Sequence, residues 1–348
     1  AEALAAYGRA LGRAEMREAG REANRCPPEL RLFDRGGRRL DEVHFHPAYH
    51  RFMEAGVAAG YAALAWEGAA GGHVTHAAMV YLASQVEPGH CCPLTMTYAG
   101  APVMAGAEGA AAGWHGKLLS RDYDPSIRPV GAKTGATLGM AMTEKQGGSD
   151  VRANTTRAEA DGGAWRLTGH KWFCSAPMSD GFLTLAQAPG GLTCFLVPRW
   201  LEGERNAIRI QRLKDKLGNR ANASAEIEYD RALAYVKQRE QFGKKIAQFQ
   251  VTQHKLADMA TKIELARLMT YKAAWNFDQG RIDPKLTSMA KMVAARTAVE
   301  VCDEAIQLHG GYGYMNEYEV ERFYRDAKIT ELYEGTREIQ KNTIASAL

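Results

Sequence analysis

The chain has 348 residues, 46% of them hydrophobic and 24% charged, which is an ordinary composition for a globular protein and allows roughly two or three domains. The net charge of +4 is too small to indicate nucleic-acid binding by itself, although a local basic patch is not excluded. No run of residues approaches the about 20 apolar positions of a membrane span, and none of the six cysteines forms a CxxC motif. The first residues are charged throughout, unlike a signal peptide, so we expect a cytoplasmic protein with free thiols.

The segment 1–131 is rich in Ala, Arg and Glu and poor in β-branched residues, a composition typical of helices. Pro27 and Pro28 end the first helical stretch, and Pro93 and Pro102 interrupt the later ones. We therefore expect an all-helical N-terminal domain. Its predicted helices are 2–22, 48–64, 77–85 and 97–107.

The segment 132–230 has a different composition, with short apolar stretches separated at regular intervals by Gly, Pro and Asp. Short strands bounded by such turn residues are typical of antiparallel sheets. We expect a central β-domain, either a sandwich or a barrel. The predicted strands are 138–143, 151–158, 165–173, 182–187, 192–197, 208–213 and 223–229.

From residue 231 onward the apolar residues recur every three or four positions, which predicts helices that each bury one face. One long helix is expected over 256–273, and Asp283-Pro284 gives a second one an N-cap and a proline at its first position. The motif His309-Gly310-Gly311 ends that second helix. The predicted fold class is α+β: a helical N-terminal domain, a central β-domain and a C-terminal helical bundle over 231–348.

The most informative stretch is Tyr333-Glu334-Gly335-Thr336, where a carboxylate lies between an aromatic residue and a glycine. Thr336 is well placed to N-cap a helix over 337–347. Glu334 would then lie beside the free N–H groups of a helix start, where an anion can bind. A carboxylate held between apolar groups near such a site is a candidate general base, and a solvated acid in an ordinary turn is the alternative.

Two motifs of the β-domain could hold a flat cofactor. The loop from Met142 to Asp150 offers glycines, a serine and exposed N–H groups that can cradle a phosphate or a ring edge. It is not a Rossmann motif because no helix follows it, and a plain connecting loop is the alternative. In the stretch GHKWFCS, Trp172 or Phe173 could pack on a ring while Ser175 donates a hydrogen bond, or the two aromatics could be core residues. We expect His170 to be structural.

Two motifs of the C-terminal part could contact a nucleotide. Arg239 could clamp a diphosphate through two parallel hydrogen bonds, or it could belong to a solvated helix end. Gln307 with Gly310 and Gly311 could present backbone groups to a cofactor, or the glycines could form a helix C-cap. Neither motif identifies a cofactor by itself.

Taken together, these motifs resemble the FAD-dependent acyl-CoA dehydrogenase family, in the order and spacing that the family uses. The resemblance covers nearly the whole chain. Up to residue 230 the chain is similar to the AidB-type alkylation-response homologues, through MAMTEKQGGSDV, GHKWFCSAPMSDG, CFLVPR and RLKDKLGNRANAS. From residue 231 it resembles short- and medium-chain acyl-CoA dehydrogenases, through RALAYVKQREQFGKK, QLHGGYGYMNEYEVERFYRDAKI and ELYEGTREIQKNTIA.

The resemblance implies a helical N-terminal domain, a central β-domain, a C-terminal four-helix bundle and assembly as a homotetramer. It implies FAD as cofactor, an acyl-CoA as substrate and an electron-transfer flavoprotein as the electron acceptor. Glu334 takes the position of the base that removes the α-proton of the thioester, and Gly335 that of an amide near the thioester. Tyr333 and Ser149 take positions on the substrate side. The β-hydride would go to N5 of the flavin.

Further residues take positions that the family uses for FAD. Phe173 matches the aromatic residue beside the flavin ring, and Arg239, Phe242 and Gln250 match contacts to the FAD of an adjacent subunit. The remaining matches on the flavin, diphosphate or nucleotide are Met142, Thr143, Ser149, Ser175, Gln307, Gly310, Gly311, Thr336 and Glu338.

The chain departs from the family pattern at Asp230–Arg231. The resemblance implies roughly 40 more residues here, a difference larger than an ordinary change of loop length. Those residues would form most of the first bundle helix, which supplies part of the acyl pocket. A segment omitted from the chain, a deletion and a chimera of two branches all fit this junction, so acyl-chain length is not predicted.

The resemblance also leaves other functions open. AidB-type proteins bind DNA through a basic C-terminal region and are poor dehydrogenases, so a DNA-associated flavoprotein of the alkylation response is the alternative function. This C-terminal part has Lys244-Lys245 and scattered arginines but no dense basic stripe, which counts against DNA binding. A flavin-free structural homologue is the third possibility.

Overall fold

A computed structural model describes residues 2–68, 70–107, 111–161, 164–201, 203–229, 250–309, 313–315 and 319–348. The chain divides into two compact units, each described here by itself. The first unit comprises Ala1–Lys216 and Arg220–Tyr235, and the second comprises Leu217–Asn219 and Val236–Leu348. The predicted division into three domains stays a prediction.

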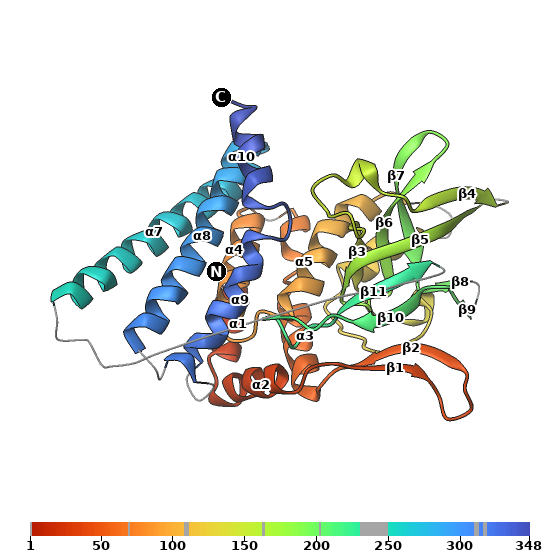
Figure 1. Cartoon of the computed structure of the whole chain (residues 1–348), viewed down its shortest axis with the longest axis horizontal. Coiled ribbons are helices and arrows are strands. Elements are labelled where there is room, and N and C mark those ends of the chain that lie inside the picture. Colours follow the sequence, from red (N-terminus) through yellow and green to blue (C-terminus); the bar gives the residue numbers. More distant parts are fainter. Residues whose placement is uncertain are drawn as a thin grey trace. The chain divides into compact units, whose positions relative to one another are not determined.

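The first part of the first unit is mainly helical (Figure 1). Its helices are α1 (Glu2–Leu11), α2 (Ala14–Arg25), α3 (Pro47–Ala59), α4 (Gly72–Ser84), α5 (Cys91–Gly100) and α6 (Trp114–Leu118). Helix α3 begins with Pro47 at its first position and ends before Gly60, whose φ of 81° is left-handed. That glycine is why the helix expected over 48–64 stops at Ala59. Tyr7, Leu11, Phe52, Met79 and Leu94 are buried together in the core of this part.

One element of the N-terminal part was not predicted. Strands β1 (Glu29–Phe33) and β2 (Arg39–His44) form an antiparallel hairpin, so the expectation of an all-helical N-terminal domain is wrong. The turn between them is closed by Asp34, whose carboxylate accepts hydrogen bonds from the backbone N–H groups of Gly36 and Arg38. Gly37 has a φ of 80°, which a glycine adopts without strain.

The described strands of the second part form a seven-stranded mixed sheet. Its order is β10-β11-β5-β4-β6-β3, and β7 pairs with β6. β3 pairs with β6 in parallel, whereas β5 pairs antiparallel with both β4 and β11. The strands of this sheet are β3 (Leu138–Ala141), β4 (Arg157–Asp161), β5 (Ala164–Ser175), β6 (Gly181–Ala188), β7 (Gly191–Pro198), β10 (Arg209–Leu213) and β11 (Ser224–Tyr229), and a separate pair comprises β8 (Trp200–Leu201) and β9 (Glu204–Arg205).

The second unit is helical, with α7 and α8 running side by side (Figure 1). Its described helices are α7 (Gln250–Asp278), α8 (Pro284–His309), α9 (Val320–Lys328) and α10 (Arg337–Ala345). The predicted N-cap at Asp283 is confirmed, since its carboxylate accepts a hydrogen bond of 2.9 Å from the N–H of Leu286. None of the described helices is both long enough and apolar enough to cross a membrane.

The loop Leu217–Asn219 belongs to the second unit because it is bound to α9. The N–H of Asn219 donates to the carboxylate of Asp326 at 2.6 Å, and Arg325 donates to the carbonyl oxygen of Leu217 at 2.8 Å. A Cβ atom on Gly218 would lie 2.5 Å from the backbone of Arg325, so a glycine is required at this close approach.

Candidate active site

The turn before α10 has an unusual backbone. Glu334 has a φ of 51° and Gly335 a φ of 89°, so both residues are left-handed. A non-glycine residue in this region is uncommon and costs on the order of 1 kcal/mol, so the surrounding structure must hold it there. Tyr333 and Glu334 both have exposed side chains, with Tyr333 43% exposed.

Side chains from two helices hold this turn in place. Gln340 of α10 donates from Nε2 to the carbonyl oxygens of Glu334 and Gly335, at 3.0 and 3.2 Å. Lys291 of α8 donates from Nζ to the carbonyl oxygen of Gly335 at 2.6 Å. Burial lowers the pKa of Lys291, while the nearby carboxylates of Glu334 and Glu331 act to raise it. The left-handed turn is therefore tied to α8 and to α10 at the same point.

The predicted helix start at Thr336 is confirmed. Its side chain accepts a hydrogen bond of 3.5 Å from the N–H of Ile339, and α10 runs from Arg337 to Ala345. Gln307 lies in the last turn of α8, and Glu338 lies in the first turn of α10. These placements do not test the roles predicted for Gln307, Thr336 and Glu338, which remain predictions.

A buried carboxylate, that of Glu331, lies just before this turn in the chain. Glu331 is 1% exposed and faces Lys328 at 2.6 Å, Arg337 at 3.4 Å and Arg296 at 3.8 Å. Burial alone would raise the pKa of Glu331, but these three cations outweigh it and lower the pKa overall. Glu331 therefore stays ionised and holds its three cationic neighbours around the segment that precedes Tyr333.

The end of β5 lies against the end of β3. Thr143 and Phe173 form an isolated antiparallel bridge, and the N–H of Trp172 donates to the carbonyl oxygen of Thr143 at 2.8 Å. A Cβ atom on Gly148 would lie 2.7 Å from Oγ1 of Thr143, so the loop after Met142 folds back over Thr143. Met142, Thr143 and Phe173 are thus neighbours where the ends of β3 and β5 meet. Ser149, next after Gly148, is exposed.

Phe173 and Trp172 have different surroundings. Phe173 is 48% exposed, whereas the ring of Trp172 is covered by the ammonium of Lys214, which lies 3.1 Å from the ring centroid. Such a contact is a cation–π interaction. Of the two rings that the sequence offered to a flat cofactor, Phe173 is the exposed one. Ser175 lies at the end of the same strand, and its hydroxyl is 2.9 Å from that of Ser224.

His170 is structural, as predicted from the sequence. Its Nε2 lies 2.8 Å from the carboxylate of Glu226, which is fully buried. The same carboxylate accepts hydrogen bonds from Arg212 at 2.8 Å and Lys214 at 3.4 Å. Burial lowers the pKa of His170, although Glu226 acts to raise it.

A buried ion pair supports the loop that follows β3. Nζ of Lys171 lies 2.7 Å from Oε1 of Glu144, and the two side chains are 0% and 3% exposed. Thr155 and Thr156 donate their backbone N–H groups to the same carboxylate, at 2.6 and 3.0 Å. Burial would raise the pKa of Glu144, but the hydrogen bonds from Lys171 and the two threonines lower it to about 2. This pair fixes the loop that carries Ser149.

Several predicted site residues cannot be placed in this way. Arg239, Phe242, Gly310 and Gly311 lie outside the described residues, as does the junction at Asp230–Arg231. Gln250 is the first described residue of α7. Among the described residues, no group of three or more His, Cys, Asp or Glu side chains could hold a metal ion.

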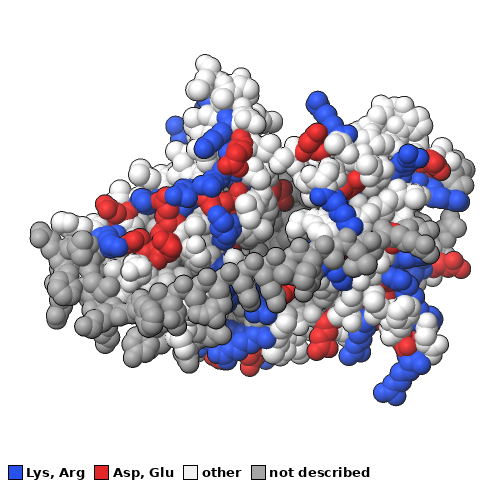
Figure 2. Space-filling model, viewed as in Figure 1, with Lys and Arg blue, Asp and Glu red and all other residues white. Residues whose placement is uncertain are grey.

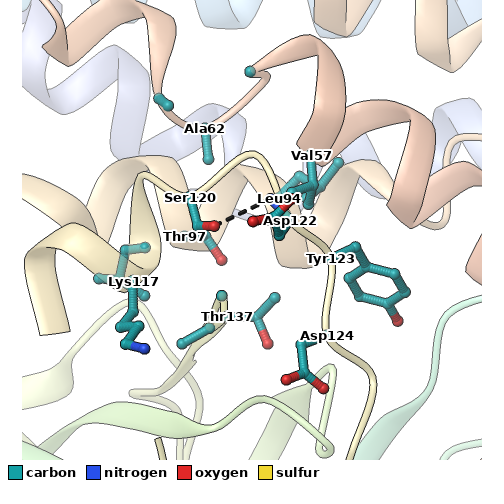
Figure 3. A pocket seen from close by; sticks show the side chains of 15 residues that line it. Val57, Ala62, Leu94, Thr97, Lys117, Ser120, Asp122, Tyr123, Asp124 and Thr137 are labelled. Atoms are coloured by element: carbon teal, nitrogen blue, oxygen red, sulfur yellow. Dashed lines mark hydrogen bonds between the residues drawn. The ribbon is translucent and has the colours of Figure 1, made fainter. Parts of the chain in front are cut away.

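Two cavities lie in the first unit, and in the described part of the chain neither is lined by a predicted site residue. Figure 3 shows the smaller one, where Lys117 and Asp124 approach from opposite sides with Thr137 between them. Its volume of about 20 Å³ has room for about one water molecule. It is too small to hold a substrate or a cofactor.

The residues where the ends of β3 and β5 meet fit a flavin. An isoalloxazine needs a flat apolar neighbour and polar groups at its edge, and this place presents the exposed ring of Phe173 beside Thr143 and Ser175. The turn at Glu334 supplies an exposed carboxylate on a fixed backbone. A flavin-dependent oxidation needs both a surface for the ring and a group that can take a proton; the sheet belongs to the first unit and the turn to the second.

Comparison with known proteins identifies the class. Residues 1–125 match the AidB N-terminal domain, residues 139–232 the acyl-CoA dehydrogenase middle domain and residues 216–348 the acyl-CoA dehydrogenase C-terminal domain. The chain belongs to the acyl-CoA dehydrogenase family of FAD-dependent oxidoreductases. Its N-terminal domain is of the AidB type, so the resemblance stated from the sequence is confirmed.

Individual relatives agree with this assignment. The chain is 41% identical over 389 residues to the putative acyl-CoA dehydrogenase AidB of Escherichia coli K12, covering 97% of this chain and 72% of that protein. Its fold is similar to butyryl-CoA dehydrogenase of Megasphaera elsdenii, with a TM-score of 0.75, 22% identity and coverage of 99% and 96%. It is also similar to Caenorhabditis elegans ACDH-11 in complex with C11-CoA, with a TM-score of 0.81, 24% identity and coverage of 96% and 67%.

The comparison with AidB also bears on the length of the chain. The matched region of 389 residues is longer than this chain of 348 residues, so AidB has residues inside that region that this chain lacks. That difference is in keeping with the shortening expected from the sequence. Its position at Asp230–Arg231 stays a prediction.

Proposed function

We propose that this protein oxidises the acyl group of an acyl-CoA thioester to the α,β-unsaturated form, with Glu334 as the base. The observation that carries the proposal is the turn at Glu334, which holds an exposed carboxylate on a left-handed backbone tied to Lys291 and Gln340. A base that must meet one carbon atom of a bound substrate requires this kind of fixed backbone. The carboxylate takes the α-proton of the thioester, and the proton then resides on Glu334.

The thioester α-proton is only weakly acidic, so the developing enolate oxygen needs hydrogen-bond donors. We assign one of them to the backbone N–H of Gly335, next to the base. FAD, when bound, accepts the β-hydride, so the protein's own part is binding, orientation and proton transfer. Tyr333 and Ser149 are assigned to the substrate side of the site.

We assign the flavin ring to the exposed face of Phe173, with Met142, Thr143, Ser149 and Ser175 at its edge. The exposure of Phe173 and its bridge to Thr143 support this assignment. Other assigned contacts to FAD, some of them in an adjacent subunit of a homotetramer, are Arg239, Phe242, Gln250, Gln307, Gly310, Gly311, Thr336 and Glu338. The reduced flavin would be reoxidised by an electron-transfer flavoprotein. We place the protein in the cytoplasm, in keeping with its free cysteines.

The test measures the reduction of bound flavin under anaerobic conditions, with butyryl-CoA, isovaleryl-CoA and octanoyl-CoA as substrates. Bleaching of the flavin absorbance reports the reduction. We expect wild type to bleach with at least one of them and Glu334→Gln to do so at least about 100-fold more slowly, because a general base contributes on this scale. Glu264→Gln is the matched control, since Glu264 is an exposed residue of α7 paired with Arg267. A Glu334→Gln variant that bleaches as fast as wild type would remove Glu334 from its role.

A DNA-associated flavoprotein of the alkylation response is the second candidate. The 41% identity to AidB and the matching N-terminal domain support it. Figure 2 shows positive and negative side chains interleaved on the face in view, without a continuous basic stripe among its described residues, which favours the dehydrogenase. The test is binding to duplex DNA at low salt and at physiological salt, since phosphate contacts weaken steeply with salt. No binding at low salt would exclude this candidate.

A further inference from the structure

The larger cavity of the first unit is lined by none of the described residues assigned above to catalysis or to FAD, although Ala176, which lines it, directly follows Ser175. Its volume is about 210 Å³. It is enclosed by the end of β2, the start of α3 and the start of α5, together with two segments, 123–137 and 176–179. All of these segments belong to the first unit, so the cavity does not depend on how the two units are arranged.

One wall of the cavity is aromatic. The rings of Phe45 and Tyr49 are stacked, with their centroids 4.2 Å apart and an angle of 14° between their planes. His50 meets Tyr49 edge-on at 5.7 Å, and its Nδ1 lies 2.8 Å from the hydroxyl of Tyr123. Four rings thus form a continuous surface that offers stacked and edge-on contacts to a further ring.

Two methionines and the cavity's exposed rim complete the apolar lining. Met53 and Met178 line the cavity, and thioethers make favourable contacts with aromatic rings. Ile127 also lines it and is 39% exposed. Because Ile127 is partly open to solvent, a larger side chain can replace it without disturbing the buried core.

A second part of the lining is polar, and each of its charges is paired with an opposite charge. Nζ of Lys133 lies 2.6 Å from Oδ1 of Asp180, and the N–H of Thr137 donates to Oδ2 of the same residue at 2.8 Å. The carboxylate of Asp124 accepts hydrogen bonds from Ser126 at 3.0 Å and from Arg128 at 2.8 Å. Each charge that lines the cavity thus has an opposite charge beside it, which favours a neutral ligand over an ion. Burial also lowers the pKa of His50, so its ring is neutral at pH 7.

Size narrows the ligand class further. An apolar cavity of about 150 Å³ binds benzene, whereas drug-sized ligands occupy pockets of about 300 to 1,000 Å³. A volume of about 210 Å³ is therefore suited to one ring with a small substituent and is too small for FAD or an acyl-CoA. Lys133 and Thr137, together with the hydroxyl of Tyr123 at the aromatic wall, offer hydrogen-bonding groups to such a substituent.

We propose that this cavity binds a neutral monocyclic aromatic molecule with one hydroxyl group, a phenol-type ligand whose ring packs on Phe45, Tyr49 and His50. The ring displaces water from the aromatic wall, and the hydroxyl group exchanges hydrogen bonds at the polar part of the lining. The proposal uses none of the residues assigned to the dehydrogenase chemistry and stands whether or not Glu334 is the base.

The test uses the full chain with its 13 methionine methyl groups labelled with ¹³C and with phenol as the probe. Met53→Leu and Met178→Leu identify the two signals of the cavity, and Met79, which is buried in α4 and does not line it, is the internal reference. We expect saturable shifts of the Met53 and Met178 signals with a dissociation constant on the order of 1 mM, a reasonable affinity for so small a ligand.

The control variants locate the effect. Ile127→Trp should fill the cavity and weaken phenol binding by at least about tenfold, whereas Val103→Trp, at a position 59% exposed and outside the lining, should bind phenol as wild type does. Cyclohexanol, which has the same size without the aromatic ring, should bind at least about threefold more weakly. The proposal is overturned by the absence of saturable shifts at Met53 and Met178, by unchanged binding in Ile127→Trp, or by equal binding of cyclohexanol.

Discussion

The ammonium group of Lys291 lies 2.6 Å from the carbonyl oxygen of Gly335, the residue directly after the proposed base. This bond joins α8 to the left-handed turn, and Gln340 joins the same turn to α10. Because Gly335 also supplies the N–H that we assign to the enolate oxygen, a shift of Gly335 would move the donor and the neighbouring base together. We therefore assign Lys291 a positioning role in the proposed site.

Lys291→Met should slow the reduction of bound flavin by acyl-CoA about tenfold, since one hydrogen bond to a charged group is worth about 1.5 kcal/mol or more. The loss should appear in the rate at saturating substrate rather than in the concentration needed for half saturation, and Lys291→Arg should recover part of it. Lys285→Met is the matched control, because Lys285 lies on the same helix and also donates to a carbonyl group, that of Ala347. Equal rates in Lys291→Met and Lys285→Met would contradict the positioning role.

Phe173→Ala should weaken FAD binding by about two- to tenfold, because a ring contact of this type contributes about 0.5 to 1.5 kcal/mol. The measurement is a titration of the flavin-free protein with FAD, in which the change in flavin fluorescence reports binding. Trp165→Ala is the control, since Trp165 lies near the start of the same strand and is 46% exposed. Equal affinities of the two variants for FAD would show that the flavin ring does not use Phe173.

Breaking the Lys171–Glu144 pair should be costly, because the remaining charge is buried without its counter-ion. Lys171→Met should lower the free energy of unfolding by about 3 to 5 kcal/mol, measured by urea denaturation. The double variant Lys171→Met, Glu144→Gln should lose less than the sum of the two single variants, since no buried charge is then left unpaired. Strictly additive losses would mean that the two side chains do not interact.

The same pair predicts a loss of stability in acid. The folded-state pKa of Glu144 is about 2, below its ordinary value of 4.5, so folding favours the ionised carboxylate. Its contribution of about 3 kcal/mol is therefore complete above pH 4.5 and is lost as the pH falls towards 2, with about 2 kcal/mol lost between pH 5 and pH 3. Urea denaturation at these two pH values should show a smaller decrease for the double variant than for wild type. The same decrease in both proteins would assign the acid sensitivity to other carboxylates.

Local signals in the sequence predicted the parts of the structure that depend on neighbouring residues. Thr336 and Asp283 were both expected as helix N-caps, and both are, because a cap is decided within four residues of chain. The hairpin β1–β2 was not predicted, although Gly36-Gly37 between the apolar residues Leu30, Leu32 and Phe33 and the later Leu40 and Val43 is a usable turn signal.

The contacts that build the site could not be predicted in the same way. Lys291 lies 44 positions from Gly335, and Lys171 lies 27 positions from Glu144, so no spacing rule connects them. The covering of Trp172 by Lys214 is likewise decided by the pairing of β5, β11 and β10, and it leaves Phe173 as the exposed ring. Only the resemblance assigned Glu334 and Phe173 to one and the same active site, and their roles remain predictions.

At Glu334, the residues that best fit the left-handed backbone are not residues that can act as the proposed base. Glycine fits this conformation without strain and asparagine fits it better than most residues, yet neither can accept a proton from carbon. A survey of all substitutions there should therefore rank glycine and asparagine among the most heat-resistant proteins and, at the same time, among the inactive ones. A protein selected only for durability would be expected to lose this glutamate, so its retention in a lineage would itself report continued use of the reaction.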